Sequence, residues 1–227
     1  MLITAICPTY NRASWISLAI QSFLAQTFTD SELVILDNGS DYTESLIPVH
    51  PRIRYEKVPG PRLRTGAIRN LCCERAQGEV ICHFDDDDWS SPERIASQIE
   101  QMKQSGKPFI GYHRISFWNA AQDSKPPKDR AHQYLGDQPY ACGTSQMYLK
   151  SYWEKNRFQN SSIGEDSDFS TRAKAAGQLA SFDGCQMIVA RAHSDSTCPA
   201  PLGQNQFPKV PLAEIPKGFL KAMGVEI

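Results

Sequence analysis

The chain has 227 residues, of which 41% are hydrophobic, and a formal net charge of -1. This length fits one α/β domain, and the hydrophobic share is that of a globular protein rather than a disordered one. Because basic residues are not in excess, a nucleic acid is not an expected partner. No apolar stretch is long enough to cross a bilayer, and the run at residues 2–6 lacks the basic flank of a signal peptide. We therefore expect a cytoplasmic protein.

Apolar runs alternate with helix-like segments through the first hundred residues. Strands are predicted at residues 2–7, 32–36, 52–58 and 79–84. Apolar residues at helical spacing, or a helix start signal, predict helices at residues 13–26, 66–76 and 92–104. The last of these helices has Ser91 as its expected N-cap, Pro92 at its first position and Gly106 at its end. This alternation predicts a mainly parallel sheet flanked by helices, in which ligands bind outside the carboxyl ends of the strands.

The second half of the chain has a less regular pattern. Its predicted elements are a strand at 109–117, a long loop at 119–137, a mixed apolar segment at 145–153, a helix at 165–176 that ends at Gly177, and a last strand at 186–192. The tail from residue 199 is rich in Pro and Gly, and we expect it to wrap the surface or to be mobile. The seven cysteines are odd in number and contain no C-x-x-C pair, so we expect all of them to be reduced.

Polar residues gather where three of the predicted strands end. They are Thr-Tyr-Asn-Arg at 9–12, Asp-Asn-Gly-Ser at 37–40 and four aspartates at 85–88. The carboxyl ends of parallel strands meet at one edge of a sheet, so these clusters are expected to converge on one crevice. Their convergence is a stronger indication of a ligand site than any one of the motifs.

Four consecutive carboxylates, Asp85 to Asp88, repel one another and raise one another's pKa values. A divalent cation relieves that repulsion, and Mg²⁺ or Mn²⁺ prefers carboxylate oxygens together with substrate phosphates. The alternative is a solvated acidic turn, or carboxylates that interact with the dipole of the following helix. The cluster by itself leaves both interpretations open.

Several short motifs follow one another in a characteristic order. They are Cys-Pro-Thr-Tyr-Asn-Arg at 7–12, Glu-Leu-Val-Ile-Leu-Asp-Asn-Gly-Ser-Asp at 32–41, Gly-Ala-Ile-Arg-Asn at 66–70, Phe-Asp-Asp-Asp-Asp-Trp at 84–89, and Pro-Glu-Arg-Ile at 92–95. Together with Gly-Glu-Asp at 164–166 and His193, this set resembles family 2 glycosyltransferases of the GT-A fold. The resemblance implies one GT-A domain over 1–227. Its expected parts are a nucleotide-binding half at about 1–100, an acceptor-binding half at about 101–198 and a tail at 199–227.

The resemblance also implies how a nucleotide-sugar donor, with a UDP-sugar favoured, is held. Asp37 is expected to read the base, although Asn38 stands where the family more often has a second Asp. The residues expected to bind the donor are Pro8, Thr9, Tyr10, Arg12, Asp37, Arg69, Asp85 and Asp86. Asp87 is the expected direct ligand of Mn²⁺ or Mg²⁺, with Asp85 and His193 as further candidates. Arg12 is expected to reach a phosphate or to lie on the surface.

Glu165 and Asp166 match the family's Glu-Asp motif. Inverting transfer needs a base that takes the proton from the acceptor hydroxyl, and we assign that role to Asp166, with Glu165 orienting it or contacting the acceptor. Without the resemblance, both would be assigned to the helix N-terminus, where carboxylates interact with the dipole. The expected acceptor is a glycan, a lipid-linked sugar or a small hydroxyl compound over residues 119–145, and the oligomeric state is left open.

Two other functions compete with this one. A sugar nucleotidyltransferase shares the α/β layout, but its Gly-rich phosphate loop is absent after the first strand, where residues 8–12 contain no glycine. A catalytically inactive nucleotide-binding module is the second alternative. The intact Asp85 to Asp87 motif and the intact Glu165-Asp166 pair favour an enzyme.

Overall fold

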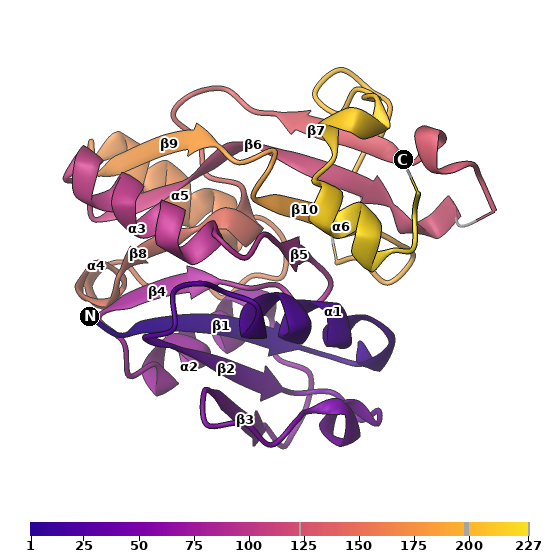
Figure 1. Ribbon diagram of the computed structural model, residues 1–227. Helices are drawn as coiled ribbons and strands as arrows, with labels where there is room; N and C mark the ends of the chain where they lie inside the picture. The colour runs from indigo at the N-terminus through magenta and orange to yellow at the C-terminus, as the bar shows by residue number, and fades with distance from the viewer. Residues whose placement is uncertain (123, 198–199, 227) are drawn as a thin grey trace.

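The computed structural model describes residues 1–122, 124–197 and 200–226, so that Cys198 lies outside it, and six cysteines are buried and free. One ten-stranded sheet runs through the molecule, with helices on both faces (Figure 1). The strands are β1 (Ile3–Thr9), β2 (Ser31–Asp37), β3 (Ile53–Lys57), β4 (Val80–His83), β5 (Trp89–Ser90), β6 (Phe109–Asn119), β7 (Ala131–Leu135), β8 (Met147–Leu149), β9 (Leu179–Asp183) and β10 (Ile188–Ala192). The α-helices are α1 (Ala13–Leu24), α2 (Thr65–Arg75), α3 (Arg94–Ser105), α4 (Lys150–Lys155), α5 (Glu165–Ala175) and α6 (Lys217–Ala222). Short 3₁₀ helices lie at Thr43–Leu46, Ala120–Gln122, Pro127–Asp129, Gly143–Ser145 and Leu212–Glu214.

The sheet order is β3-β2-β1-β4-β8-β6-β10-β5, with β7 and β9 paired to β6. Strands β1 to β4 are parallel, and Thr9 at the end of β1 lies beside Asp37 at the end of β2. Strand β8 pairs with both β4 and β6, which joins the two halves into one sheet. The predicted mainly parallel α/β architecture is confirmed, and the polar clusters lie at one edge of the sheet.

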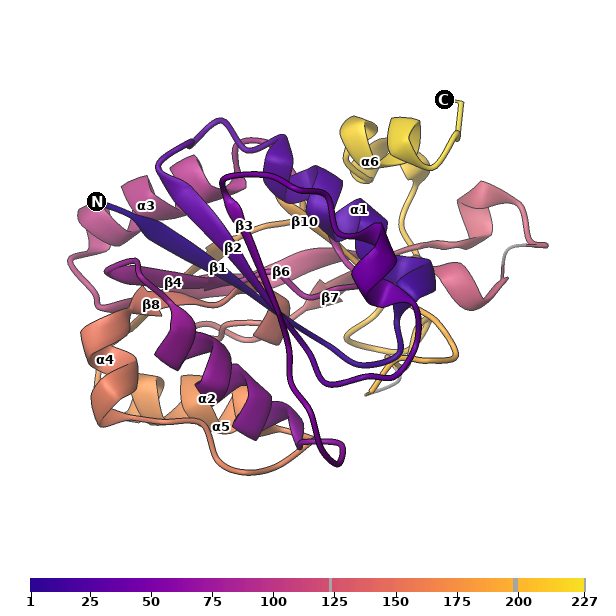
Figure 2. The same ribbon diagram turned by 90° about the horizontal axis from the view of Figure 1, so that it is seen from below.

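Each face of the sheet has its own layer of helices, as Figure 2 shows. Helices α2, α4 and α5 cover one face, where Ile68, Tyr152 and Phe169 pack into one core cluster. Helices α1 and α3 cover the other face, where Phe23 and Ile99 belong to a second cluster. The helices on both faces anchor the strand ends that carry the polar residues. None of the helices in the described part of the chain is long and apolar enough to cross a membrane.

The predicted loop at 119–137 was wrong, because it contains β7, which pairs antiparallel with β6. Strand β9 was also missed. The C-terminal tail packs against the domain: Leu135 N donates to Gln206 O at 2.9 Å and Val210 N donates to Ala131 O at 3.1 Å. Helix α6 then inserts Phe219 beside Trp118 in a further core cluster. The tail thus wraps the surface beside β7, one of the two outcomes we expected.

The start of α3 differs from the prediction, whereas its end agrees with it. The helix begins at Arg94 rather than at Pro92, because Arg94 N donates to Ser91 O at 3.0 Å in a preceding turn. The Ser91 hydroxyl donates to the Glu93 carboxylate at 2.9 Å and does not cap the helix. Gly106 ends the helix in the left-handed conformation, with φ of 62°. Gly177 does the same one residue after the C-cap of α5, with φ of 65°.

Candidate active site

A cavity of about 550 Å³ opens beyond the carboxyl ends of β1 and β4, a size and position typical of ligand sites in α/β sheets. All three polar clusters reach it: Thr9, Tyr10 and Arg12 after β1, Asn38 after β2, and the four aspartates after β4. The start of α5 closes the opposite side with Glu165 and Asp166. The expected convergence of the strand ends on one crevice is therefore what the structure shows.

The loop after β1 is shaped by Asn11, which has a positive φ of 52°. Its side-chain oxygen accepts from Ser40 N at 2.6 Å and from Asp41 N at 3.2 Å. Asp41 in turn accepts from Ala13 N at 2.9 Å, at the first turn of α1. Asn tolerates the left-handed region better than most residues, so the Asn11-Arg12 sequence turns the chain sharply and directs Arg12 toward the carboxylates.

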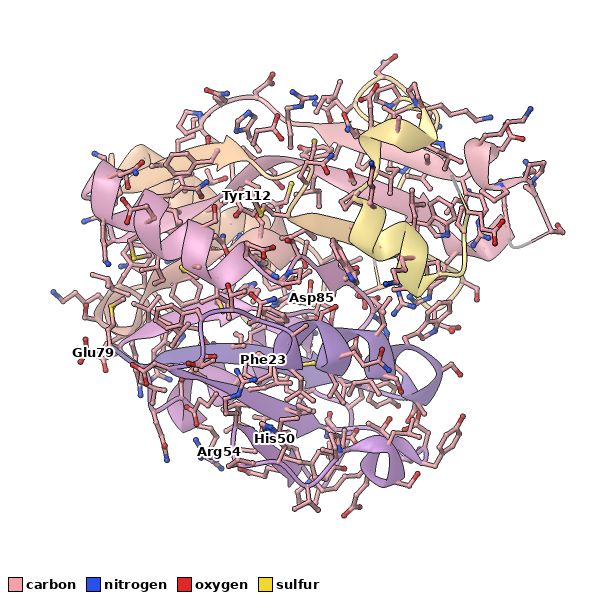
Figure 3. The ribbon with its side chains drawn as sticks, in the orientation of Figure 1. Phe23, His50, Arg54, Glu79, Asp85 and Tyr112 are labelled. Carbon is pink, nitrogen blue, oxygen red and sulfur yellow. The ribbon has the colours of Figure 1, made fainter. Side chains whose placement is uncertain are left out.

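The four aspartates lie at the junction between the two halves of the molecule, where Figure 3 labels Asp85. Asp85 is the most open of them, with 23% of its side chain exposed, and it pairs with Arg69 at 3.1 Å. Arg12 pairs with Asp86 at 3.0 Å and forms a closer ion pair with Asp87. Asp88 accepts from the backbone N–H of Arg191 at 3.0 Å, and the guanidinium of Arg191 donates to the Asp87 carbonyl. Arginines therefore offset much of the charge of the run.

The surroundings shift the pKa values of the carboxylates in the run in different directions. Burial and the neighbouring Asp87 raise the pKa of Asp86 to about 7. Burial and the same neighbour raise the pKa of Asp88 well above its usual value. Burial also acts to raise the pKa of Asp87, but the hydrogen bond with His193 and the charge of Arg12 outweigh burial and lower it. Asp87 is thus the buried member of the run that stays ionised most readily.

His193, an expected metal ligand, lies against Asp87. Its Nε2 is 3.1 Å from Asp87 Oδ2, and its Nδ1 accepts from Asp195 N at 3.1 Å. The ring stacks on Trp15 with the centroids 3.8 Å apart. Because Nδ1 is an acceptor, Nε2 carries the proton and donates to Asp87. The stacking and the two hydrogen bonds fix the orientation of the imidazole.

The donor set suits Mn²⁺ or Mg²⁺ in kind, since it offers carboxylate oxygens and one imidazole nitrogen. No group of three or more His, Cys, Asp or Glu side chains within the described residues is arranged to hold a metal ion. The Arg12 guanidinium stands between Asp86 and Asp87 and also donates to Asp195 O at 2.8 Å. A metal ion on Asp87 Oδ2 would therefore have to displace Arg12.

Asp37 lies beneath the cavity rather than on its wall. It is fully buried, and its carboxylate accepts from Gly39 N at 2.7 Å, from Tyr55 Oη at 2.9 Å and from Lys57 Nζ at 2.7 Å. The adjacent Asn38 does line the cavity. The expected reading of the base by Asp37 stays a prediction, and in this conformation the carboxylate fixes the loop after β2. Sequence reasoning gave Asn38 no role.

The first turn of α5 presents two carboxylates with different surroundings. Glu165 is buried and accepts from Arg69 Nε at 3.3 Å, and burial raises its pKa although Arg69 opposes the shift. Asp166 is half-buried and lines the cavity, and its Oδ1 accepts from Ser167 N at 2.7 Å. A Cβ placed on Gly143 would come within 1.9 Å of Asp166 Oδ2. Gly143 is therefore a site residue that sequence reasoning missed, because its role depends on a contact with a distant helix.

The cavity continues past Asp166 along an aromatic surface that the sequence did not predict. We call Phe117, Tyr134, Tyr140 and Phe207 the aromatic wall, and all four line the cavity. Their rings touch in sequence, with centroid distances of 5.2 Å for Phe117 and Phe207, 4.9 Å for Tyr134 and Phe207, and 5.8 Å for Tyr134 and Tyr140. The residues of the wall come from β6, β7, the segment after β7 and the tail. Because they are far apart in the sequence, no local motif predicts the wall.

The sequence is similar to glycosyltransferases. Residues 4–157 match the family described as glycosyl transferase family 2. An uncharacterized glycosyltransferase of Rickettsia conorii is 35% identical over 122 residues, which are 50% of this chain and 20% of that protein. The succinoglycan biosynthesis protein ExoO of Rhizobium meliloti is 34% identical over 106 residues, 46% of this chain and 30% of that protein. The matched stretch thus spans a third or less of either relative.

Two solved structures share the fold. TarS of S. aureus in complex with UDP-GlcNAc superposes with a TM-score of 0.72 at 16% identity, over 87% of this chain and 60% of that chain. The mannosyltransferase PcManGT of Pyrobaculum calidifontis, in complex with GDP-Man and Mn²⁺, gives a TM-score of 0.64 at 18% identity, over 83% of this chain and 56% of that chain. At these identities the likeness establishes the fold.

Proposed function

The chain belongs to glycosyl transferase family 2, and on that premise we propose that it moves a sugar from a nucleoside-diphosphate donor to a hydroxyl group with inversion at the anomeric carbon. The observation that carries the proposal is one cavity lined by both the Asp85–Asp88 run and Asp166. Metal-binding carboxylates on one side and a half-buried carboxylate on the other are what such a displacement needs. The leaving group and the attacking hydroxyl would then lie on opposite sides of the sugar.

The donor side of the cavity suits a nucleoside diphosphate. Pro8, Thr9 and Tyr10 form its wall, and the Arg62 guanidinium lies 4.3 Å from the centre of the Tyr10 ring. Arg12 and Arg69 bring positive charge to the side where a diphosphate would sit. Support for a UDP-sugar in particular comes from TarS, which was solved with UDP-GlcNAc. Asp37 is fully buried in this conformation, so it would reach a uracil only after a rearrangement of the loop after β2.

Asp87, with Asp85 and His193, would hold the Mn²⁺ or Mg²⁺ that we propose as cofactor. His193 would bind it through Nε2 in the other tautomer, in which Nδ1 carries the proton and no longer accepts from Asp195 N. A divalent ion there would offset charge on the leaving diphosphate. Support comes from the ordered His193 imidazole beside the ionised Asp87, and from the Mn²⁺ in the PcManGT complex. Arg69 stays paired with Asp85 and Glu165, and so holds α2 and α5 in place on both sides of the cavity.

Asp166 is the proposed base. The Ser167 N–H occupies Oδ1, which leaves Oδ2 to take the proton of the acceptor hydroxyl as that oxygen attacks the anomeric carbon. The absence of a side chain on Gly143 leaves room for Oδ2 in this position. Glu165 is held by Arg69 and orients the first turn of α5. The arginines around the aspartate run stabilise the leaving diphosphate until it dissociates.

The test is a paired measurement of binding and turnover. We expect UDP to bind more tightly with Mn²⁺ present, by isothermal titration calorimetry, and a UDP-sugar to be transferred or slowly hydrolysed. Asp166→Asn removes the base, so we expect the rate to fall about 10²- to 10⁴-fold while UDP still binds.

The matched control is Asp168→Asn. Asp168 lies in the same turn of α5, but it pairs with Arg172 at 2.9 Å and does not line the cavity. The Asp168→Asn protein should transfer or hydrolyse the UDP-sugar at the rate of the wild type. An Asp166→Asn protein as active as the wild type would remove Asp166 as base, and formation of a nucleotide-sugar from a nucleoside triphosphate would favour the nucleotidyltransferase alternative.

A further inference from the structure

The aromatic wall lies in the same cavity as the proposed base but beyond it. Tyr140 Oη is 3.4 Å from Ser167 Oγ, and Ser167 follows Asp166 in the first turn of α5. The wall therefore adjoins the place where an acceptor hydroxyl must lie to reach Asp166. The donor side of the cavity ends at the Asp85–Asp88 run, so the aromatic wall is left for the acceptor to contact.

The wall rests on a rigid base. Phe117, Tyr134 and Tyr140 pack against a buried cluster that includes Tyr112, whose side chain is fully buried. Phe207 comes from the tail, but the residues on each side of it are held: Leu135 N donates to Gln206 O at 2.9 Å and Gln133 N donates to Pro208 O at 3.2 Å. These backbone bonds align the tail beside β7 and fix the Phe207 ring against Phe117 and Tyr134.

This part of the cavity contains no charged side chain among its described lining residues. Those lining residues from 115–144 and 200–207 are Ile115, Phe117, Tyr134, Tyr140, Cys142, Gly143, Thr144, Ala200, Pro201 and Phe207. The lining arginines, among them Arg12, Arg69 and Arg191, all lie on the donor side or at the end of β10. A phosphate or carboxylate of the acceptor would find no cation among these lining residues, and burying it unpaired is costly.

We propose that the aromatic wall is a subsite for an uncharged sugar ring, so that the acceptor is a neutral saccharide. This inference rests on the proposed transfer reaction and names its acceptor class. A sugar ring has apolar C–H faces that pack on aromatic rings, and hydroxyl groups that hydrogen-bond to tyrosine. The wall offers both, since it joins two phenyl rings to the hydroxyls of Tyr134 and Tyr140. A lipid chain would use the rings but would make no hydrogen bond to the tyrosine hydroxyls.

The segment that completes the wall lies outside the family match, which ends at residue 157. Phe207 contacts both Phe117 and Tyr134, so removing its ring opens one side of the subsite. The selectivity for the acceptor is therefore assigned to the C-terminal tail together with β6 and β7, whereas the donor side comes from the family motifs. The two sides can be tested separately.

The experiment measures acceptor binding directly, by saturation-transfer difference NMR in the presence of UDP. The probes are methyl glycosides of neutral hexoses and N-acetylhexosamines, the matching uronates and 6-phosphates, and octyl glycosides. We expect neutral methyl glycosides to bind with the strongest saturation on their ring C–H protons. Phe207→Ala should weaken this binding about tenfold, because it removes one of the stacked rings. Phe207→Tyr should restore most of the affinity.

The matched control is Tyr42→Ala, which removes a ring that is 62% exposed and does not line the cavity. It should bind glycosides as the wild type does. If Phe207→Ala fails to fold, Tyr134→Phe, which keeps the ring and loses the hydroxyl, should still weaken binding. Binding confined to uronates or phosphates, or saturation on the octyl chain alone, would overturn the inference.

The two proposals fail in different ways. Neutral glycosides that bind to a protein with no affinity for UDP would refute the proposed donor and keep the wall as a saccharide subsite. Turnover of a UDP-sugar by a protein that binds no neutral glycoside would refute the subsite and keep the transferase.

Discussion

Arg12 was expected to reach a phosphate or to lie on the surface, and its largely buried side chain rules out only the second alternative. Its guanidinium lies between Asp86 and Asp87, and its other nitrogen donates to Asp195 O at 2.8 Å and to Thr197 Oγ1 at 3.2 Å. The sequence identified the carboxylates, because consecutive aspartates are a visible pattern. It could not identify their partner, since residue 12 meets residues 86 and 87 only in the folded chain.

The position of Arg12 predicts competition between the protein's own cation and a metal ion. We expect Arg12→Ala to bind Mn²⁺ alone about tenfold more tightly than the wild type, because it removes a positive charge that is held against Asp87 Oδ2 and competes with the ion. Titration calorimetry with Mn²⁺ and no nucleotide measures this change. Arg12→Lys retains a cation and should stay close to the wild type. Weaker Mn²⁺ binding by Arg12→Ala would show that Arg12 supports the metal site rather than competing for it.

At the scale of elements, strands were predicted correctly from the sequence where the buried positions carry apolar residues. Strands β1 and β2 are almost wholly buried apolar runs, and both were predicted. Strand β7 was missed because its buried positions include His132 and Gln133, so its composition does not reveal its burial. Strand β9 is short and only partly buried. The start of α3 was misplaced because Ser91 has the residue type of an N-cap but bonds to a neighbouring side chain instead.

The contact between α2 and the 159–162 loop makes Gly66 sensitive to any side chain. Gly66 N donates to Ser161 O at 2.8 Å, and a Cβ on Gly66 would lie 1.8 Å from Gln159 O. We expect Gly66→Ala to destabilise the protein by about 1–3 kcal/mol through overpacking, despite the better helix propensity of Ala. Urea unfolding measures this loss.

The neighbouring substitution Thr65→Ala serves as the control for Gly66→Ala. The Thr65 hydroxyl makes only a 3.4 Å contact with Ser162 O, so the change in stability should stay within about 0.5 kcal/mol. A Gly66→Ala protein as stable as the wild type would mean that α2 can shift without cost. Because Arg69 lies one turn further along α2, such a shift would also show in its pairing with Asp85.

For the whole molecule, the sequence could predict the part of the site that is formed by the ends of the parallel strands. Three polar clusters converge because β1, β2 and β4 are neighbouring parallel strands, and parallel strands end at a common edge. The acceptor side could not be predicted, because the aromatic wall depends on the pairing of the tail with β7 over a separation of about 70 residues. A periodicity in the sequence reports local structure and carries no information on such pairings.

The linkage between folding and protonation gives a prediction for the whole molecule. Burial, and then the charge of Arg69, lower the pKa of His83 well below its ordinary value, although the Gly143 carbonyl opposes the shift. Below about pH 6.5, the unfolded chain therefore binds a proton at His83, whereas His83 stays neutral in the folded protein. The contribution of His83 to stability is complete above that pH and is lost as the pH falls. Asp86, whose pKa is raised to about 7, acts in the opposite direction.

Since these two groups oppose each other, the informative quantity is a difference between two proteins. We expect the slope of unfolding free energy against pH, below pH 6.5, to be larger for the wild type than for His83→Gln, approaching a difference of about 1.4 kcal/mol per pH unit. Urea titrations from pH 5.0 to 7.5 give both slopes. The lost contact with Tyr148, 3.1 Å from His83 Nε2, lowers the stability of the variant at every pH and cancels from the slope. Equal slopes would show that the folded protein accommodates a charged His83 beside Arg69.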